Sequence, residues 1–277
     1  MKKGISVWAF PEDFTPEQCF IEAKRAGFDG VELAMGSSGI TEDSTEEEIK
    51  TIRALAEKHG MELYSVACAL YIANSLTSND PAQRARAERI VKRQLDIAAW
   101  LGCDTVLVVP GVVSSPLDTS IETVPYDAAY DRALDWMRRL APYAEEKGVV
   151  IAIENVWNRF LLSPLEMRGI IDAVGSEWVK AYFDVGNILL IGHPEQWIRI
   201  LGKRIQKVHI KDFRVSVGNL DGFVDLLTGN VDFPEVMRAL SEIGYDGWIT
   251  AELGPNGHYP TTNLAAISAA MDAIMNR

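Results

Sequence analysis

The sequence predicts an α/β fold, a single (β/α)8 TIM barrel that spans residues 1–277. Two observations support this prediction. Amphipathic helical stretches alternate with short runs of Val, Ile and Leu along the whole chain, and there are eight segments of each kind. Strands that alternate with helices pair in parallel, and eight such units in 277 residues favour a closed barrel. An open doubly wound sheet is the alternative, but no predicted strand leads into a G-x-G-x-x-G turn.

The predicted strands occupy the apolar runs, most of which follow a glycine. We place them in the segments 4–10, 24–35, 57–68, 100–110, 146–155, 179–187, 205–212 and 242–253. Five of these segments contain a glycine at the junction with the preceding helix, as in KRAGFDG and EKGVV. Glycine there fits the left-handed residue that ends a helix before the chain turns into a strand.

The predicted helices fill the stretches between the strands. They lie near residues 16–26, 45–59, 81–101, 126–147, 163–174, 194–201, 232–243 and 262–275. The acidic run TEDSTEEEIK (41–50) indicates a charged loop and a helix start, with Ser44 or Thr45 as the N-cap. Longer connections at 68–82, 110–126 and 212–231 each follow a strand, where a barrel keeps its functional loops.

Composition limits the kinds of partner that we expect. The formal net charge of -12 argues against nucleic acid, because binding to phosphates rests on Lys and Arg. No apolar segment is long enough to span a bilayer, and the apolar stretch after MKK stops at Pro11, too early for a signal peptide. The three cysteines have no C-x-x-C spacing, so we expect neither disulfides nor a zinc knuckle. These features predict a cytoplasmic protein with a small-molecule partner.

Polar residues stand at the ends of four consecutive predicted strands: Glu154, Asp184, His209 and Glu252. A single acid at a strand end is more often a solvated residue or a helix cap. In a barrel, however, the C-terminal strand ends converge, and three adjacent carboxylates destabilise one another unless a metal cation or an Arg or Lys side chain neutralises them. Three oxygen donors and one imidazole suit Mn²⁺, Mg²⁺ or Co²⁺, and Zn²⁺ is also compatible. The pattern therefore predicts one divalent metal ion, since four histidines are too few for a multi-zinc cluster.

Four segments, in their order and spacing, resemble a known family: IAIENVWNRF, YFDVGN, KVHIKDF and GYDGWITAE. They are similar to the xylose-isomerase-like TIM barrels, specifically the sugar and sugar-phosphate isomerase/epimerase branch. This branch includes ketose 3-epimerases, L-ribulose- or L-xylulose-5-phosphate 3-epimerases and hexulose-6-phosphate isomerase-like proteins. The resemblance covers essentially the whole chain.

The resemblance implies roles for individual residues. The metal ligands would be Glu154, Asp184, His209 and Glu252, and the acid/base pair would be Glu154 and Glu252. The implied activity is that of a divalent-metal-dependent isomerase or epimerase of a ketose or ketose phosphate. Its proton transfer would pass through a metal-bound cis-enediolate.

Two departures from the family pattern bear on specificity. Ketose 3-epimerases often have a histidine three residues after the strand-six aspartate, where this chain has Asn187. They also often have a further glutamate after strand five, where this chain has VWNRF. The abasic-site endonuclease of the same superfamily has additional histidines that are missing here, which disfavours that function.

Six residues at or just beyond strand ends are candidate substrate contacts. Trp8 and Trp157, with Phe213, would stack against C–H faces of a sugar, although ordinary packing over the barrel mouth is the simpler explanation of all three. Glu32 is a candidate for a contact with a substrate hydroxyl or for an ion pair on the helix side. Lys211 and Arg214 are candidates for phosphate or hydroxyl contacts. The alternative is an ion pair with Asp212 for Lys211 and a surface position for Arg214. The six residues are Trp8, Glu32, Trp157, Asn187, Lys211 and Arg214.

Two other functions remain compatible with the sequence. An inosose-type dehydratase would use the same scaffold and metal ligands, and a non-catalytic sugar-binding protein would bind without proton exchange. In each case the expected partner is a small-molecule sugar or sugar phosphate. A homo-dimer or a homo-tetramer is the form of self-association that we consider.

Overall fold

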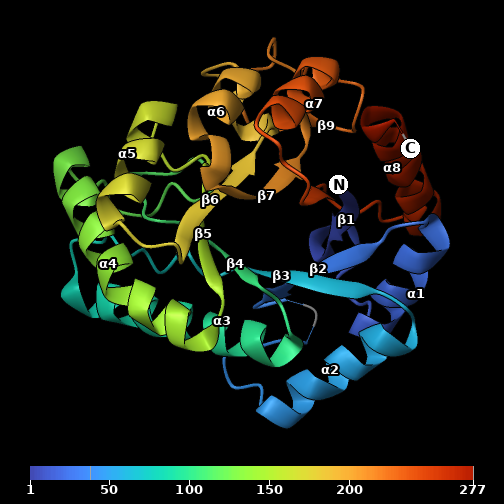
Figure 1. Cartoon of the computed structure of the whole chain (residues 1–277), viewed down its shortest axis with the longest axis horizontal. Coiled ribbons are helices and arrows are strands. Elements are labelled where there is room, and N and C mark those ends of the chain that lie inside the picture. Colours follow the sequence, from blue (N-terminus) through green and yellow to red (C-terminus); the bar gives the residue numbers. More distant parts are fainter. Residues whose placement is uncertain (38, 277) are drawn as a thin grey trace.

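Eight parallel strands close into a barrel in the computed structural model, which describes residues 1–37 and 39–276. The order around the barrel is β1-β10-β7-β6-β5-β4-β3-β2, and a ring of helices surrounds it (Figure 1). The predicted (β/α)8 fold is confirmed. The barrel strands are β1 (Lys2–Ser6), β2 (Gly30–Met35), β3 (Glu62–Cys68), β4 (Thr105–Val108), β5 (Val150–Glu154), β6 (Val179–Asp184), β7 (Ile205–Ile210) and β10 (Trp248–Ala251).

The helices of the ring lie where the apolar periodicity predicts them. They are α1 (Pro16–Ala26), α2 (Glu46–Lys58), α3 (Pro81–Leu101), α4 (Tyr126–Lys147), α5 (Pro164–Val174), α6 (Pro194–Leu201), α7 (Phe233–Glu242) and α8 (Pro260–Met275). Thr45, one of the two predicted caps, forms a capping box with Glu48 at the start of α2. Gly27, Gly102 and Gly148 end their helices with φ values of 90°, 80° and 66°, as the predicted left-handed positions require.

The first strand is shorter than the sequence predicts. We expected a strand over 4–10, but β1 ends at Ser6 and Val7–Ala9 form a short 3-10 helix. The hydroxyl of Ser6 caps this turn by accepting a hydrogen bond from the backbone N–H of Trp8 at 3.5 Å. The prediction was wrong here because Val7 and Ala9 are buried and make the turn as apolar as a strand.

The long connection after β7 contains structure that the sequence analysis did not predict. Its two-residue strands β8 (Asp212–Phe213) and β9 (Phe223–Val224) pair in an antiparallel hairpin. The buried carboxylate of Asp212 accepts hydrogen bonds from the backbone N–H groups of Phe213, Gly229 and Val231, at 2.8–3.1 Å. Asp212 therefore organises this loop.

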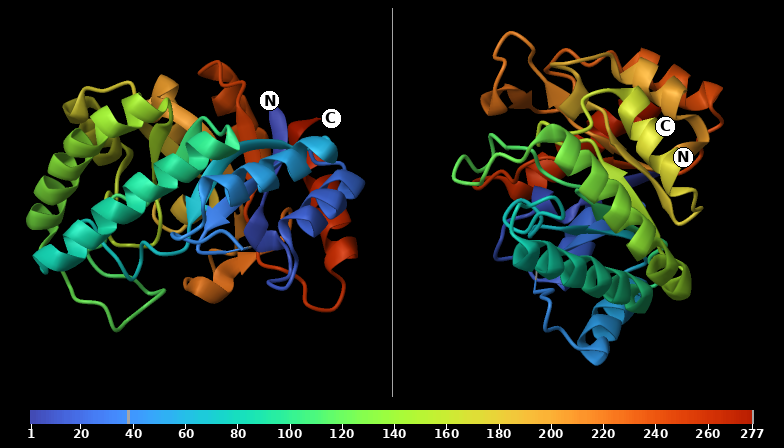
Figure 2. Two further views of the ribbon diagram at one scale, coloured as in Figure 1. Left: turned by 90° about the horizontal axis from the view of Figure 1, so that it is seen from below. Right: turned by 90° about the vertical axis from the view of Figure 1, so that its left-hand side faces the viewer.

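Loops that follow the strands gather on one side of the barrel. In the left view of Figure 2, the connections after β4, β7 and β10 project together at the bottom. This is the side on which (β/α)8 barrels carry their functional residues. Within the described residues, no helix is long and apolar enough to cross a membrane.

Candidate metal centre

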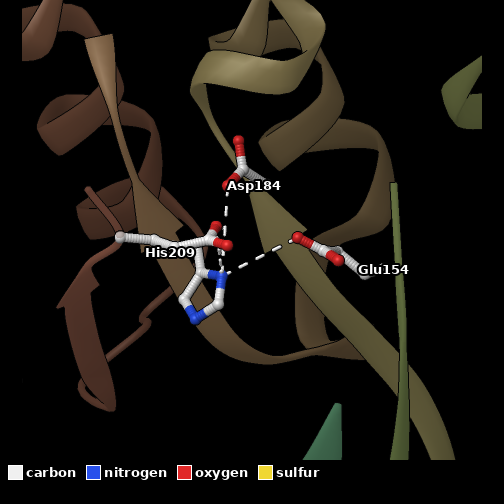
Figure 3. Close-up of side chains that lie close together, drawn as sticks. Glu154, Asp184 and His209 are labelled. Carbon is white, nitrogen blue, oxygen red and sulfur yellow. Dashed lines mark ion pairs between the residues drawn. The ribbon is translucent and has the colours of Figure 1, made fainter. Parts of the chain in front are cut away.

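Four polar side chains meet inside the C-terminal rim of the barrel. Glu154 ends β5, Asp184 ends β6, His209 lies near the end of β7 and Glu252 directly follows β10. One candidate ligand atom from each lies within 4.8 Å of the others. Figure 3 shows the carboxylates of Glu154 and Asp184 pointing toward the His209 ring. The Nδ1 atom of His209 lies 3.0 Å from Glu252 Oε2, 3.7 Å from Glu154 Oε1 and 4.0 Å from Asp184 Oδ2.

The donor atoms of this cluster fit a divalent cation. Three buried atoms make no hydrogen bond among the described residues and have only ion-pair contacts within the cluster: Asp184 Oδ2, His209 Nδ1 and Glu252 Oε2. Buried polar atoms in folded proteins are nearly always hydrogen-bonded, so three convergent exceptions require an explanation. Carboxylate oxygens and one imidazole are suitable ligands for a divalent ion. The cluster is therefore a candidate metal centre.

Lys211 provides the cationic contact of the cluster. Its ammonium lies 2.6 Å from Glu252 Oε2 and 3.3 Å from Asp184 Oδ2, and only 15% of the side chain is exposed. From the sequence we expected Lys211 to contact the substrate or to form an ion pair with Asp212. In the structure Lys211 pairs with Asp184 and Glu252, because the loop after β7 occupies the Asp212 carboxylate.

The environment moves the pKa values of the two glutamates in opposite directions. Burial raises the pKa of Glu154. Burial also acts to raise the pKa of Glu252, but the charges of Lys211 and His209 outweigh it and lower that pKa. For His209, burial acts to lower the pKa, while Glu32 and Glu252 raise it well above its usual value. The environment therefore disfavours the charge of Glu154 and favours the charge of Glu252.

Glu32 lies behind His209, on the side away from the other carboxylates. Its Oε1 is 2.8 Å from His209 Nε2, and its Oε2 accepts hydrogen bonds from the hydroxyls of Tyr182, at 2.5 Å, and Ser65. We expected Glu32 to contact a substrate hydroxyl or a helix, but the fully buried side chain contacts His209 instead. With its Nε2 proton held by Glu32, His209 would present Nδ1 to a metal ion, which would displace the second proton of the charged ring.

The Glu32→Gln variant is expected to bind Mn²⁺ about 10- to 100-fold more weakly, because a carboxylate that orients a ligating histidine typically has this effect. Isothermal titration calorimetry of the metal-free protein measures the change. The melting temperature of the metal-free variant, compared with the original protein, serves as the control for folding. Unchanged Mn²⁺ affinity in a folded variant would show that Glu32 does not orient His209.

Asn155 and Asn187 join the ends of β5 and β6. The Asn155 amide donates to the backbone oxygen of Asp184 at 2.7 Å and accepts from the backbone N–H of Asp184 at 2.9 Å. The backbone N–H of Asn187 donates to Asp184 Oδ1 at 2.7 Å, which leaves Oδ2 facing the cluster. This role of Asn155 was not predicted from the sequence, although its position directly after Glu154 was a signal.

Two adjoining cavities open around the cluster. The outer cavity, of about 1200 Å³, is lined by Trp8, Lys211, Arg214 and Glu252 among others. The inner cavity, of about 320 Å³, includes both Glu154 and Glu252 in its lining. Among the candidate substrate contacts, the inner cavity is also lined by Trp8, Trp157, Asn187 and Lys211.

Two other predicted residues lie farther from the cluster. Arg214 is exposed and lines the outer cavity but not the inner one. Its guanidinium donates a hydrogen bond to the backbone oxygen of Thr228 at 3.1 Å. Phe213 is fully buried, and its ring packs 5.4 Å from that of Trp157 and 5.0 Å from that of Phe223. Phe213 thus packs behind Trp157, which lines the inner cavity.

The apparent affinity for Mn²⁺ is expected to rise with pH between about 5 and 7. Burial raises the pKa of Asp184 from 3.8 to about 7, so the folded metal-free protein keeps a proton that the unfolded chain releases at lower pH. This proton stabilises the metal-free fold at low pH, and its stabilising effect is lost as pH rises through about 7. A metal ion must displace this proton and also the Nδ1 proton of a charged His209, so we expect the affinity to change at least about tenfold per pH unit.

Calorimetric titrations in buffers of different ionisation enthalpy measure both this affinity and the protons released. A titration with chloride salts of a monovalent cation controls for ionic strength. An Mn²⁺ affinity that is independent of pH over this interval would contradict the expectation.

The fold and the cluster together define a class of protein: a (β/α)8 barrel with a candidate divalent-metal centre at the C-terminal rim of its strands. The chain belongs to the xylose isomerase-like TIM barrel family, whose family model matches residues 20–274.

Proteins with similar sequences have more than one activity. The inosose dehydratase of Geobacillus thermodenitrificans is 26% identical over 263 residues, which cover 87% of this chain and 82% of that protein. The L-ribulose 3-epimerase of Methylomonas sp. is 27% identical over 241 residues, which cover 83% of this chain and 75% of that protein. The relatives thus include sugar epimerases and dehydratases, which supports an enzymatic role.

Solved structures share the fold. The D-psicose 3-epimerase from Clostridium cellulolyticum H10, solved with D-tagatose, has a TM-score of 0.81 and 20% sequence identity, over 100% of this chain and 99% of that chain. At this level of identity the likeness concerns the barrel itself.

Proposed function

We propose that residues 1–277 form one catalytic domain, a divalent-metal-dependent isomerase or epimerase of a ketose or ketose phosphate. The observation that carries this proposal is the placement of two glutamates, Glu154 and Glu252, in one cluster that also borders the inner cavity. The metal ligands would be these two residues with Asp184 and His209. The oxygen-rich donor set favours Mn²⁺, Mg²⁺ or Co²⁺.

When bound, the divalent ion would supply a Lewis acid that polarises the ketose carbonyl and acidifies the neighbouring C–H. One glutamate would accept that proton, and the other would return a proton to the opposite face of the carbon, which inverts the centre. Return of the proton to the adjacent carbon would instead exchange ketose and aldose. Lys211, through its ion pairs with Asp184 and Glu252, would offset the negative charge of the cluster during these proton transfers.

Solvent exchange tests this mechanism. The Mn²⁺-loaded protein is incubated in D₂O with a panel of ketoses and ketose phosphates, and deuterium at the carbon next to the carbonyl is measured by NMR. We expect deuterium in recovered substrate and in product, because the removed proton equilibrates with solvent on a glutamate. Conversion without any deuterium uptake would contradict the proposal and indicate hydride transfer.

A dehydratase is the second candidate, because an inosose dehydratase is among the relatives. Such an enzyme would use the same initial proton abstraction and then expel a hydroxyl group as water. Product analysis with a cyclitol ketone separates the two functions, since only the dehydratase forms a product that lacks the elements of water. A non-catalytic sugar-binding protein would bind ketoses without either change.

A further inference from the structure

The lining of the inner cavity is largely apolar outside the residues of the metal centre. Both glutamates line this cavity, so a substrate whose reacting carbon lies between them would extend one end of the molecule into it. At about 320 Å³ the cavity is at the small end of the range for small-molecule sites. Six aliphatic side chains contribute to its lining: Ile72, Leu107, Val109, Leu117, Val156 and Leu220.

Most polar side chains in the lining already have partners within the protein. The Tyr71 hydroxyl donates to Gln94, and the Trp157 indole N–H donates to the backbone oxygen of Asn187 at 3.0 Å. The Asn187 amide donates to the backbone oxygen of Asn155 at 3.0 Å. Outside the metal cluster, few side-chain groups of the described lining remain to meet the hydroxyls of a substrate.

The lining also offers little positive charge. Lys211 is the only Lys or Arg among the described residues that line the inner cavity, and its ammonium contacts two carboxylates. Arg214 lines the outer cavity and is exposed. A phosphate in the inner cavity would therefore lose its hydration without gaining a free cation, which is strongly unfavourable.

We infer that the inner cavity holds a deoxygenated, unphosphorylated end of the substrate, so that the preferred substrate is a ketose with a terminal methyl group, or a compound with a similarly apolar end. The inference rests on the proposed function, which places the reacting carbon between Glu154 and Glu252. Its physical basis is that a terminal hydroxyl would be buried without partners, whereas a methyl group would gain apolar contacts.

Matched ligands test this inference. Calorimetry with the Mn²⁺-loaded protein compares each parent ketohexose with its 6-deoxy and 6-phosphate derivatives, in the D- and L-fructose and D- and L-tagatose series. We expect at least one 6-deoxyketose to bind about tenfold more tightly than its parent, equivalent to about 1.4 kcal/mol. We expect every 6-phosphate to bind more weakly than its parent. Tighter binding of the parent or the phosphate in every series, or no binding of any 6-deoxyketose, would overturn the inference.

Two variants locate the effect in the cavity wall. Leu117→Gln and the nearly isosteric Val109→Thr each place a polar group in the lining, and both should reduce the preference for the 6-deoxyketose several-fold. Leu165→Gln is the matched control, because Leu165 is 57% exposed, similar to Leu117 at 51%, and does not line either cavity. An unchanged preference in both cavity variants would place the apolar end elsewhere and overturn the inference.

Deuterium exchange with the same ligands separates this inference from the proposed function. Preferential binding of a 6-deoxyketose without exchange in any series would reject the proposed function and retain the apolar subsite. Exchange with a preference for the 6-phosphates would retain the proposed function and reject the apolar subsite.

Discussion

Glu252→Gln and Glu154→Gln are each expected to lower kcat by at least about 10³-fold, within the range of about 10²–10⁴ that general acid–base groups contribute. Glutamine keeps the volume of the side chain but cannot accept and return the proton. Initial rates with the substrate identified by deuterium exchange measure the effect. The matched control is Glu12→Gln, because Glu12 is an exposed glutamate that lines the outer cavity. Full activity in either variant would remove that residue from the acid/base role.

The two variants should differ in stability even though both lose activity. The lowered pKa of Glu252 means that its ionised carboxylate stabilises the fold near neutral pH, through Lys211 and His209. The raised pKa of Glu154 means that its charge opposes folding there. In the metal-free proteins, Glu252→Gln should therefore lower the melting temperature, while Glu154→Gln should leave it unchanged or raise it. The reverse order would contradict the electrostatic account of the cluster.

Removal of divalent metal is expected to abolish turnover and to lower the melting temperature. Metal analysis should find one divalent ion per chain in active protein and none after dialysis against EDTA. At a free metal concentration of about 100 times Kd, binding stabilises the native state by about 2.7 kcal/mol. For a chain of 277 residues that free energy corresponds to roughly 5 °C.

Dialysis against the same buffer without EDTA is the control, and addition of Mn²⁺, Mg²⁺ or Co²⁺ to the depleted protein should restore activity. The ion that restores the highest rate identifies the preferred metal. Full activity in the depleted protein would contradict the proposed function.

The barrel was predictable from sequence because its signals are local. Helical periodicity, caps such as Thr45 and left-handed glycines such as Gly148 each act within a few residues. The same alternation of strands and helices then places the ends of β5, β6, β7 and β10 on one side. For this reason the sequence also predicted that Glu154, Asp184, His209 and Glu252 would lie together.

Contacts between distant residues could not be predicted in this way. Glu32 and His209 are 177 positions apart, and they meet because both side chains point into the barrel interior. The ion pair of Lys211 with Glu252 likewise depends on how the loop after β7 engages Asp212. The end of β1 at Ser6 was missed because buried turns and buried strands have the same apolar composition.

The sequence by itself determined the (β/α)8 architecture and the four residues that gather at the C-terminal rim, because both follow from local patterns and from the geometry of parallel strands. Only the tertiary structure decided which nitrogen of His209 faces the carboxylates, which charges Lys211 neutralises and how apolar the inner cavity is. These properties depend on the packing of side chains from separate strands and loops, and each side chain is oriented by neighbours far from it in the chain.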